Sequence, residues 1–241
     1  MPSRAATRSM TATTHAPPRR RRALGRDEIT PVMDILRREA PSWGAPAVTL
    51  IADTTGDPFR VLISTILSLR TQDETTAVAS RRLFARAADP AAMLKLRAAT
   101  IEKLIYPVGF YRTKARAILD VCRALIDRFD GKVPCDLDAL LTLNGVGRKT
   151  ANLVLTLGFR AQGICVDTHV HRITNRWGYV RTKTPNDTEQ ALRKILPPEH
   201  WIEINDILVA FGQRLCRPIS PHCSRCPIVE YCPRRGVTSS R

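Results

Sequence analysis

The sequence predicts an all-α protein. Apolar residues recur at helical spacing through nearly all of the 241 residues, whereas runs of alternating β-branched residues, which favour strands, are scarce. A hydrophobic content of 44% is enough to build one or two compact domains with their own cores. Because the apolar stretches are short and are joined by short polar loops, we expect a helical bundle of two lobes.

Helix-start and helix-stop residues divide the chain into its expected helices. Pro41 and Gly44 are expected to end the first helix. Asp57 followed by Pro58 is typical of an N-cap and a first helical residue. The helix after Pro58 is apolar nearly all round, which predicts full burial. In chain order we expect helices over 27–38, 59–69, 73–87, 90–96, 100–106, 111–129, 137–143, 148–157, 168–177, 188–196 and 201–213.

The charge balance predicts a polyanionic partner. The formal net charge is +16 at pH 7, and arginine far outnumbers lysine. Phosphates favour such a surface because bound Lys and Arg release counterions, and arginine forms bidentate phosphate contacts. No apolar run approaches the ~20 residues that span a membrane. Nucleic acid rather than a bilayer is therefore the expected partner.

Residues 1–26 are expected to stand apart from the bundle as a basic, disordered tail. They contain no acidic residue and include four consecutive arginines at positions 19–22. Two interpretations stay open. One is a DNA-contacting tail of a bacterial protein that works in the cytoplasm, at the nucleoid. The other is a segment that targets the protein to a mitochondrion or a nucleus.

A glycine-rich turn between two expected helices is the strongest candidate for a phosphate site. Gly145 and Gly147 allow a positive φ and leave no side chain to block a ligand. Backbone N–H groups of this turn and of the next helix start have no intrahelical partner, so they can hold an anion. Lys149 lies in the first turn of that helix, and Asp167 follows about one helix-length later. A phosphate clamp, an amine and a carboxylate so close in sequence predict chemistry on DNA.

The cysteines near the C-terminus have the spacing of a metal or cluster site. They follow the pattern C-x6-C-x2-C-x5-C, with prolines between them that favour a tight loop. Such thiolates can bind zinc or a [4Fe–4S] cluster, and the single C-x2-C pair favours iron–sulfur because structural zinc sites more often carry two close pairs. The cysteines of this pattern are Cys216, Cys223, Cys226 and Cys232. The other cysteines lie in or beside apolar segments and are expected to be small core residues. They are Cys122, Cys135 and Cys165.

Three motifs together resemble one known family. LNGVGRKTANLVL, VDTH and the cysteine pattern, in this order and at this separation, resemble the endonuclease III family of DNA glycosylases. The resemblance extends over about residues 27–235. It implies the two-lobed helix-hairpin-helix glycosylase fold, with a six-helix lobe at 51–161 that contains the hairpin. A second lobe, made of 27–50 and 162–241, is then expected to hold a [4Fe–4S] cluster in its C-terminal cysteine loop.

The resemblance also implies a function, base excision repair of double-stranded damaged DNA by a monomer. Such an enzyme binds DNA across the cleft between its lobes and flips the damaged nucleotide out of the stack. It then removes oxidised pyrimidines and cleaves the strand at the abasic site by β-elimination. On the matched positions, Lys149 is the nucleophile that forms a Schiff base and Asp167 is the catalytic aspartate. Asp167 also fits the N-cap of the helix that follows, and the two roles are compatible.

Further matched positions concern DNA contact. By resemblance, the hairpin grips phosphate through backbone amides, and its residues are Gly145, Val146 and Gly147 with Arg148 beside them. His169 follows the aspartate as in the family. It is expected to contact phosphate or to make a structural hydrogen bond.

This sequence departs from the family pattern around the expected lesion site. Arg70 stands where many relatives carry a glutamine that inserts opposite the lesion. Since arginine reads guanine edges well, we expect a different opposite-base preference. Phe110 occupies the place of a leucine-like wedge that fills the gap left by the flipped base, although a core position fits it equally well. Asn144 replaces the proline usual before the hairpin, and because asparagine tolerates turn geometry the hairpin is still expected to form.

Two other functions fit less of the sequence. An adenine-mismatch glycosylase of the same fold carries a catalytic glutamate in the early apolar helix and usually lacks the hairpin lysine. Here 61–69 contains no carboxylate and Lys149 is present. A non-catalytic DNA-binding iron–sulfur protein needs neither Lys149 nor Asp167, and both are present.

Overall fold

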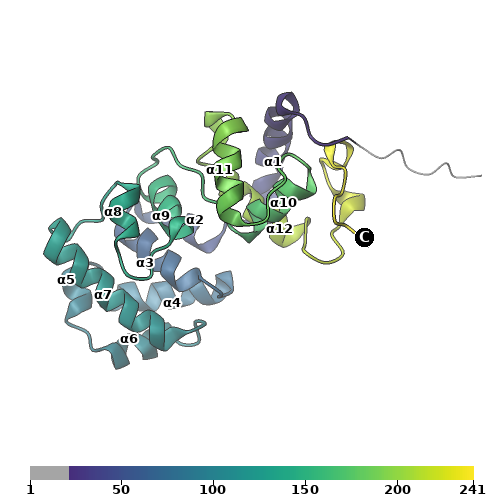
Figure 1. Ribbon diagram of the computed structural model, residues 1–241. Coiled ribbons are helices and arrows are strands. Elements are labelled where there is room, and N and C mark those ends of the chain that lie inside the picture. The colour runs from purple at the N-terminus through teal and green to yellow at the C-terminus, as the bar shows by residue number, and fades with distance from the viewer. Residues whose placement is uncertain (1–21) are drawn as a thin grey trace, which may run out of the picture.

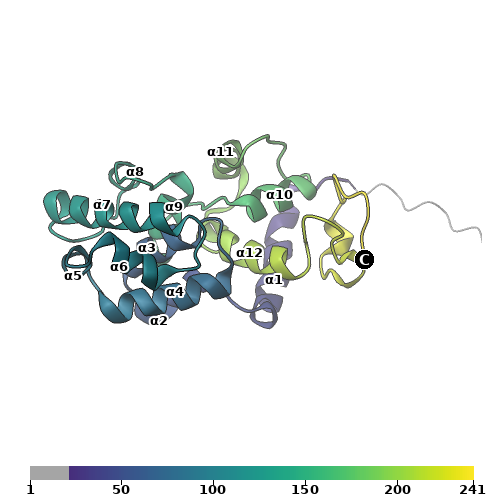
Figure 2. The ribbon, with the colours of Figure 1, turned by 90° about the horizontal axis from the view of Figure 1, so that it is seen from below.

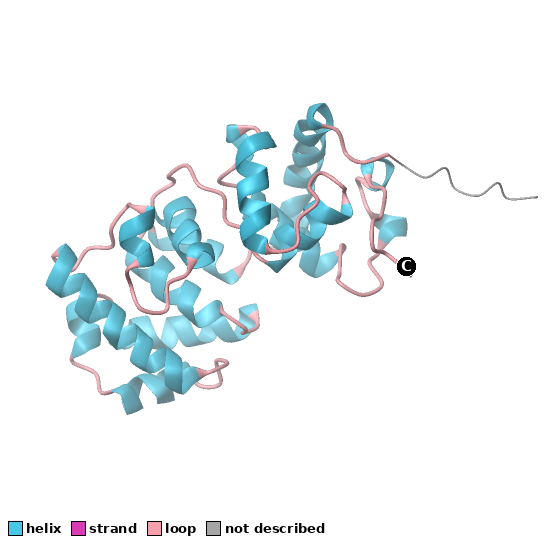
Figure 3. Ribbon diagram, viewed as in Figure 1, coloured by secondary structure: helices cyan, strands magenta, loops and turns pink. Residues whose placement is uncertain are grey.

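The computed structural model of the protein describes residues 22–241, and helices are the regular secondary structure of that range, with no strand in it (Figure 1; Figure 3). The prediction of an all-α protein is confirmed. Most of the arginine-rich tail lies outside the described residues. The α-helices are α1 (Ile29–Trp43), α2 (Ala47–Thr55), α3 (Pro58–Ser68), α4 (Asp73–Arg86), α5 (Pro90–Leu94), α6 (Ala98–Ile105), α7 (Tyr111–Phe129), α8 (Leu137–Leu141), α9 (Arg148–Leu153), α10 (Thr168–Arg176), α11 (Pro185–Ile195) and α12 (Ile204–Arg214).

Shorter helical turns complete the secondary structure. A π-helical turn follows α9 at Val154–Gly158. The 3-10 turns are Arg26–Glu28, Pro198–His200, Cys223–Arg225 and Val229–Tyr231. No helix within residues 22–241 is both long enough and apolar enough to cross a lipid bilayer.

The helices form two lobes, each with its own apolar core. The first lobe contains α2 to α9, and its core is built around α3, which packs against α2, α4, α7 and α9. The second lobe joins α1 to α10, α11 and α12, and its core includes Met33, Trp177 and Phe211. The lobes lie end to end, with the C-terminal loop at the far end of the second lobe (Figure 1; Figure 2). The chain therefore crosses from the second lobe to the first after α1 and returns after α9.

α3 is buried because of its composition and begins where its start signal predicts. An Asp57 carboxylate oxygen accepts a hydrogen bond from the Phe59 N–H at 2.9 Å, and Pro58 occupies the first helical position. The predicted cap is thus confirmed. Every residue of 61–67 is buried. Since each buried aliphatic side chain contributes roughly 1.5–3 kcal/mol, burial of this helix contributes substantially to the stability of the first core.

The segment between α1 and α3 differs from the sequence prediction. Pro41 does not end the first helix, because α1 continues to Trp43 and stops at Gly44, whose φ is +81°. A proline in the last turn removes only one backbone hydrogen bond, so the helix tolerates it. The sequence did not predict α2 either. This helix of 9 residues packs Val48 and Ala52, which are spaced one helical turn apart, into the first core.

The helix predicted over 148–157 has an irregular second half. α9 ends at Leu153, and the following π-helical turn closes with a hydrogen bond from the Ala161 N–H to the Leu155 carbonyl at 3.0 Å. Gly158 lies in this turn directly against α3, where a Cβ would come within 3.1 Å of the Pro58 Cα. Single π-helical turns of this kind are frequent near functional sites. This one leads into the segment that returns to the second lobe.

Candidate active site

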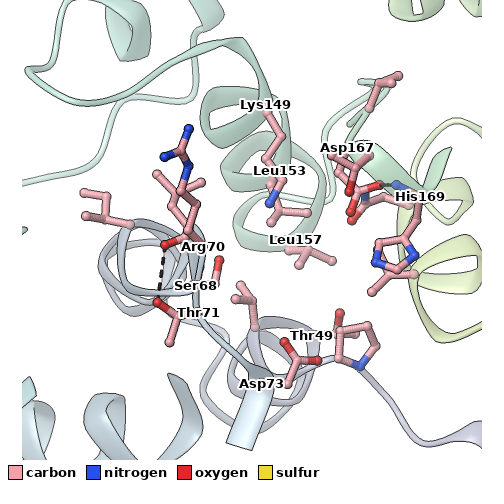
Figure 4. A pocket seen from close by; sticks show the side chains of 18 of the residues that line it. Thr49, Ser68, Arg70, Thr71, Asp73, Lys149, Leu153, Leu157, Asp167 and His169 are labelled. Atoms are coloured by element: carbon pink, nitrogen blue, oxygen red, sulfur yellow. Dashed lines mark hydrogen bonds between the residues drawn. The ribbon is translucent and has the colours of Figure 1, made fainter. Parts of the chain in front are cut away.

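A pocket of about 820 Å³ lies between the two lobes. Its walls come from α2, α3 and the loop after it, α7 and α9 in the first lobe, and from the start of α10 and α12 in the second (Figure 4). The fold thus brings widely separated parts of the chain to one cavity. The residues singled out from the sequence that line it are Arg70, Phe110, Gly145, Lys149, Asp167 and His169.

Lys149 projects from the first turn of α9 into this pocket. Figure 4 shows its amine between Arg70 on one side and Asp167 and His169 on the other. The residue is half-buried, and within residues 22–241 the amine has no hydrogen-bond or ion-pair partner. An amine that is enclosed but unpaired is available to a ligand or to a reacting carbon atom.

Asp167 is held in place by the helix that it begins. One of its carboxylate oxygens, Oδ1, accepts hydrogen bonds from the backbone N–H groups of His169 at 2.8 Å and Val170 at 2.9 Å. The N-cap role that the sequence allowed for Asp167 is therefore present. Because both bonds use Oδ1, the carboxylate has a defined orientation while Oδ2 is left for another partner.

The glycine turn forms a tight hairpin between α8 and α9. Gly145 has φ +78°, and the Val146 N–H donates to the Leu143 carbonyl at 3.1 Å. Val146 anchors the turn, since its side chain is buried in the first core. Gly147 does not use the positive φ that glycine allows, since its φ is −93°, but it leaves open space where a Cβ would point. The hairpin forms with Asn144 in the position where proline is usual.

Arg148 links the two lobes. Its guanidinium donates to both carboxylate oxygens of Glu189 on α11, at 3.1 and 2.7 Å, and Arg193 donates to the same carboxylate at 3.0 Å. Burial alone would raise the pKa of Glu189, but the hydrogen bonds from Arg148 and Arg193 lower it below its ordinary value. The Arg148 side chain is thus engaged in an ion pair between lobes. A side-chain contact from Arg148 to phosphate would have to compete with this ion pair.

His169 packs against the second lobe rather than standing free. Its Nδ1 lies 3.2 Å from an Arg172 nitrogen, and a Cβ at Gly212 would come within 2.3 Å of the same ring atom. Only glycine therefore fits at position 212. Burial lowers the pKa of His169, although the charge of Asp167 opposes this shift, so the ring is neutral at pH 7. A neutral imidazole still donates one hydrogen bond, which serves either of its predicted roles.

Arg70 and Phe110 stand together at the rim of the pocket. Both are exposed, and both have the left-handed backbone conformation, with φ of +53° and +58°. The Arg70 guanidinium carbon lies 5.6 Å from the centre of the Phe110 ring, within the range of a cation–π contact. Phe110 is 63% exposed, so the alternative of a core phenylalanine was wrong.

Two polar residues in the pocket wall, Lys114 and Asp206, were missed by sequence reasoning. Lys114 is 7% exposed, and burial lowers its pKa to about 8. Its position on the apolar face of α7, one turn before Ile118, was the available signal. Asp206 accepts a hydrogen bond from the Thr49 hydroxyl at 2.9 Å, and burial raises its pKa to about 6. Nothing in the sequence marks Asp206, since acidic residues are common in the first turn of a helix.

The C-terminal cysteines surround a second, small pocket. Cys216, Cys223, Cys226 and Cys232 line it together, next to Trp177 and Phe211 of the second core. Within residues 22–241 no group of three or more His, Cys, Asp or Glu side chains is arranged so as to hold a metal ion.

The three other cysteines were all expected in the core, and the structure buries two of them. Cys122 and Cys165 are buried, as predicted. Cys135 is exposed, so the expectation for this residue was wrong. It lies in the loop between α7 and α8, where the neighbouring apolar side chains pack without enclosing it.

Comparison with known proteins places this arrangement in a family. The sequence matches the HhH-GPD superfamily base excision DNA repair protein over residues 63–198. Endonuclease III of Thermotoga maritima is 49% identical over 183 residues, which cover 75% of this chain and 86% of that protein. The chloroplastic endonuclease III homolog 2 of Arabidopsis thaliana is 43% identical over 218 residues, covering 84% of this chain and 56% of that protein. This chain therefore spans just over half of the plant protein.

Solved structures agree with the sequence relatives. A non-covalent endonuclease III–DNA complex matches with a TM-score of 0.78 at 34% identity, covering 87% of this chain and 95% of that one. The chain belongs to the endonuclease III family of the HhH-GPD superfamily. A trapped covalent endonuclease III–DNA intermediate also matches, with a TM-score of 0.76 at 33% identity over 87% of this chain and 96% of that one. The family resemblance of the hairpin, VDTH and cysteine motifs is thereby confirmed.

Proposed function

We propose that this member of the endonuclease III family is a bifunctional DNA glycosylase and abasic-site lyase that removes oxidised pyrimidines from double-stranded DNA. The observation that carries the proposal is a single pocket, between two lobes, that contains the unpaired amine of Lys149 and the oriented carboxylate of Asp167. The family supports the reaction class, since its superfamily acts in base excision DNA repair.

Lys149 is the proposed nucleophile. Its neutral amine attacks C1′ of the flipped nucleotide, the N-glycosidic bond breaks, and the base leaves with the bonding electrons and takes up a proton. Loss of a proton from the nitrogen and opening of the sugar ring leave a Schiff base between Nζ and C1′. Removal of a proton from C2′ then expels the 3′ phosphate by β-elimination. Water finally hydrolyses the Schiff base and frees Lys149.

Asp167 supports these steps from its capping position. Positive charge develops on the sugar as the base departs, and a carboxylate held at a fixed place stabilises that charge without first having to reorient. Two backbone N–H groups hold Oδ1, so Oδ2 is the atom available to the sugar or to a shuttled proton.

DNA binding uses the hairpin, the rim and the overall charge. The hairpin amides at Gly145 and Gly147 hold a backbone phosphate, while Arg70 and Phe110 at the rim fill the space that the flipped nucleotide leaves. The net charge of +16 favours the duplex as a whole. All of these groups belong to one chain, which supports action as a monomer.

We propose that the C-terminal cysteine loop supplies the thiol donors of a [4Fe–4S] cluster. Four thiol donors line one pocket, and the sulfur of Cys216 accepts a hydrogen bond from Arg176 at 3.2 Å. Cys232 accepts one from the Arg234 backbone N–H at 3.4 Å. Hydrogen bonds to the sulfurs are usual around such clusters. Cys216, which follows α12, and the three cysteines of the loop would hold the cluster, and its binding would tie the loop to the end of this helix.

Absorption and metal analysis test the cluster assignment. Purified protein should be yellow-brown, and Cys223→Ser should lose the colour together with its iron and acid-labile sulfide. Cys135→Ser removes an exposed cysteine outside the loop and should keep both. Colourless wild-type protein with stoichiometric zinc would show that the loop binds zinc instead.

Trapping with borohydride on abasic-site duplex DNA tests the proposed reaction. The wild-type protein should form a covalent adduct and Lys149→Ala should form none, whereas Lys95→Ala, which removes an exposed lysine of the first lobe, should trap normally. Full trapping by Lys149→Ala would assign the nucleophile elsewhere. Release of adenine from a mismatch without a trapped adduct would favour the adenine-mismatch glycosylase. DNA binding with neither reaction would favour a non-catalytic protein.

A further inference from the structure

The two exposed residues at the rim come from loops that the fold joins together. Arg70 lies between α3 and α4, and Phe110 immediately precedes α7. Each has a left-handed backbone conformation that an L-residue other than glycine or asparagine adopts rarely. Neither conformation is explained by its own sequence. The contacts around them must therefore hold both residues in place.

Lys114 makes most of those contacts with the Arg70 loop. Its ammonium donates to the carbonyl oxygens of Leu67 at 2.8 Å and Leu69 at 2.6 Å, and it lies 3.2 Å from the Thr71 hydroxyl. An ammonium has three donors, and these acceptors use all of them. The acceptors lie on both sides of Arg70. The side chain of Lys114 thus fixes the backbone from which Arg70 projects.

The same lysine is tied to Phe110 through its backbone. The Lys114 N–H donates to the Phe110 carbonyl at 3.0 Å, which places the lysine one helical turn after the exposed ring. One residue therefore connects the two rim residues, by its side chain to one loop and by its main chain to the other.

Thr71 and Gly109 close the connection directly. The Gly109 N–H donates to the Thr71 hydroxyl at 3.2 Å, the same oxygen that Lys114 approaches. A Cβ at Gly109 would lie 2.6 Å from the Arg70 carbonyl oxygen, a distance that no side chain permits. The backbones of the Arg70 loop and the Phe110 loop are therefore in direct contact at Gly109, because this residue has no side chain.

We propose that Lys114, together with Thr71 and Gly109, locks Arg70 and Phe110 into one rigid probe that enters the duplex at the lesion. Lys114 is thus a positioning residue for base flipping and for choice of the opposite base. The proposal rests on the glycosylase function above. Side chains that displace stacked bases must be held rigidly. If their loops could yield, part of the binding free energy would deform the loops and would not unstack the bases. The amine of Lys114 is fully engaged, unlike that of Lys149, so it braces the loops and does not attack the sugar.

Comparing a duplex substrate with a single-stranded one distinguishes a role of Lys114 in base flipping from general support of the fold. Lys114→Met keeps a long side chain but removes the donors, and Thr71→Val removes the shared hydroxyl with little change of shape. On a single-lesion duplex, Lys114→Met should lower kcat/KM about tenfold, the loss typical of missing charged hydrogen bonds, and should reduce the difference between opposite bases. On a single-stranded abasic oligonucleotide, which needs no flipping, strand cleavage should stay within about twofold. Lys103→Met, at an exposed lysine on α6, is the matched control and should change neither.

A double-mutant cycle tests whether Lys114 acts through the probe. In a protein that already carries Arg70→Ala and Phe110→Ala, adding Lys114→Met should lower the duplex rate by no more than about twofold. A full additional loss there would overturn the proposal, as would equal losses on the single-stranded and duplex substrates or an unchanged opposite-base preference. If Lys114→Met does not fold, Thr71→Val decides the matter by the same comparisons. Absence of a borohydride adduct with the wild-type protein would instead refute the glycosylase function itself.

Discussion

Asp167 illustrates how one residue can cap a helix and also supply the carboxylate of the proposed reaction. The carboxylate that begins α10 is the one that faces the pocket. Capping fixes its orientation, and the carboxylate lines the same pocket as Lys149. The two functions are separable by substitution, because asparagine caps a helix about as well as aspartate but carries no charge.

Asp167→Asn should therefore slow base removal without unfolding α10. We expect a loss of roughly 10²–10⁴-fold in the single-turnover rate, with DNA binding and the free energy of unfolding nearly unchanged. Asp167→Ala should lose the same activity and, in addition, about 1 kcal/mol of stability because the cap is gone. Single-turnover kinetics and urea unfolding measure the two effects. If Asp167→Asn abolished DNA binding, the role of the carboxylate would be structural.

The buried carboxyl of Asp206 predicts a pH dependence of stability. Burial raises its pKa from 3.8 to about 6, while the hydrogen bond from Thr49 opposes this shift. Between these values the folded state holds a proton that the unfolded state has lost. Stability therefore falls as the pH rises through this window, and the full cost of the buried charge is present above about pH 6.

Asp206→Asn should remove that cost while still accepting the Thr49 hydrogen bond. The variant should be more stable than the wild type by on the order of 2 kcal/mol at pH 7, and the difference should disappear near pH 4. Urea unfolding at several pH values measures it. Asp127→Asn, at an exposed site on α7, should show no such trend. An equal stabilisation at pH 4 and pH 7 would rule out the buried charge as its cause.

At the scale of elements, local signals predicted the helices with clear caps and periods. α7 has the predicted bounds of 111–129, and α3 begins at its predicted cap. α2 and the extension of α1 past Pro41 depend on tertiary burial, so the sequence did not reveal them. The loops that carry Arg70 and Phe110 were identified only by family resemblance. Their conformations are set by contacts to Lys114 and Gly109, which are distant in sequence from Arg70.

The ion pair between α9 and α11 predicts that Glu189 stabilises the contact between the two lobes. Its side chain is 3% exposed and is shared by two arginines that are only partly buried. Glu189→Ala should cost about 2 kcal/mol of unfolding free energy, since it removes the carboxylate that both guanidinium groups share. The exposed pair of Arg160 and Asp53 gives the comparison, because Asp53→Ala should cost at most about 1 kcal/mol. Equal losses in urea unfolding would mean that the buried link adds no stability.

At the scale of the whole molecule, the charge and the cleft act together. Residues of both lobes line the pocket. The chain crosses between the lobes after α1, before the hairpin, and again after α9, beyond it. The net charge of +16 draws a duplex to the surface without regard to sequence. Specific chemistry then depends only on the few groups inside the pocket. Affinity and catalysis should therefore respond to different substitutions.

Residues 1–21 carry five arginines, so their removal should weaken the salt dependence of DNA binding. The slope of log affinity against log salt concentration should become shallower by up to about 0.9 for each arginine that contacts phosphate. Titrations of a labelled duplex at several salt concentrations measure the slope. A chain that keeps the tail but replaces its arginines with glutamine separates charge from length. An unchanged slope in both variants would show that the tail does not contact DNA.

The sequence by itself determined the helical class, most helix positions and the family, because these depend on local periods, caps and short motifs. It also marked Lys149 and Asp167 as candidates, since both lie in such motifs, and the structure brings the two residues to one pocket. Tertiary structure alone decided that Arg148 binds Glu189, that Gly147 has an ordinary φ and that Lys114 supports the rim. These outcomes depend on which side chains meet across lobes and loops. Hydrogen-bond partners are chosen by proximity in space, and no local pattern along the chain encodes that proximity.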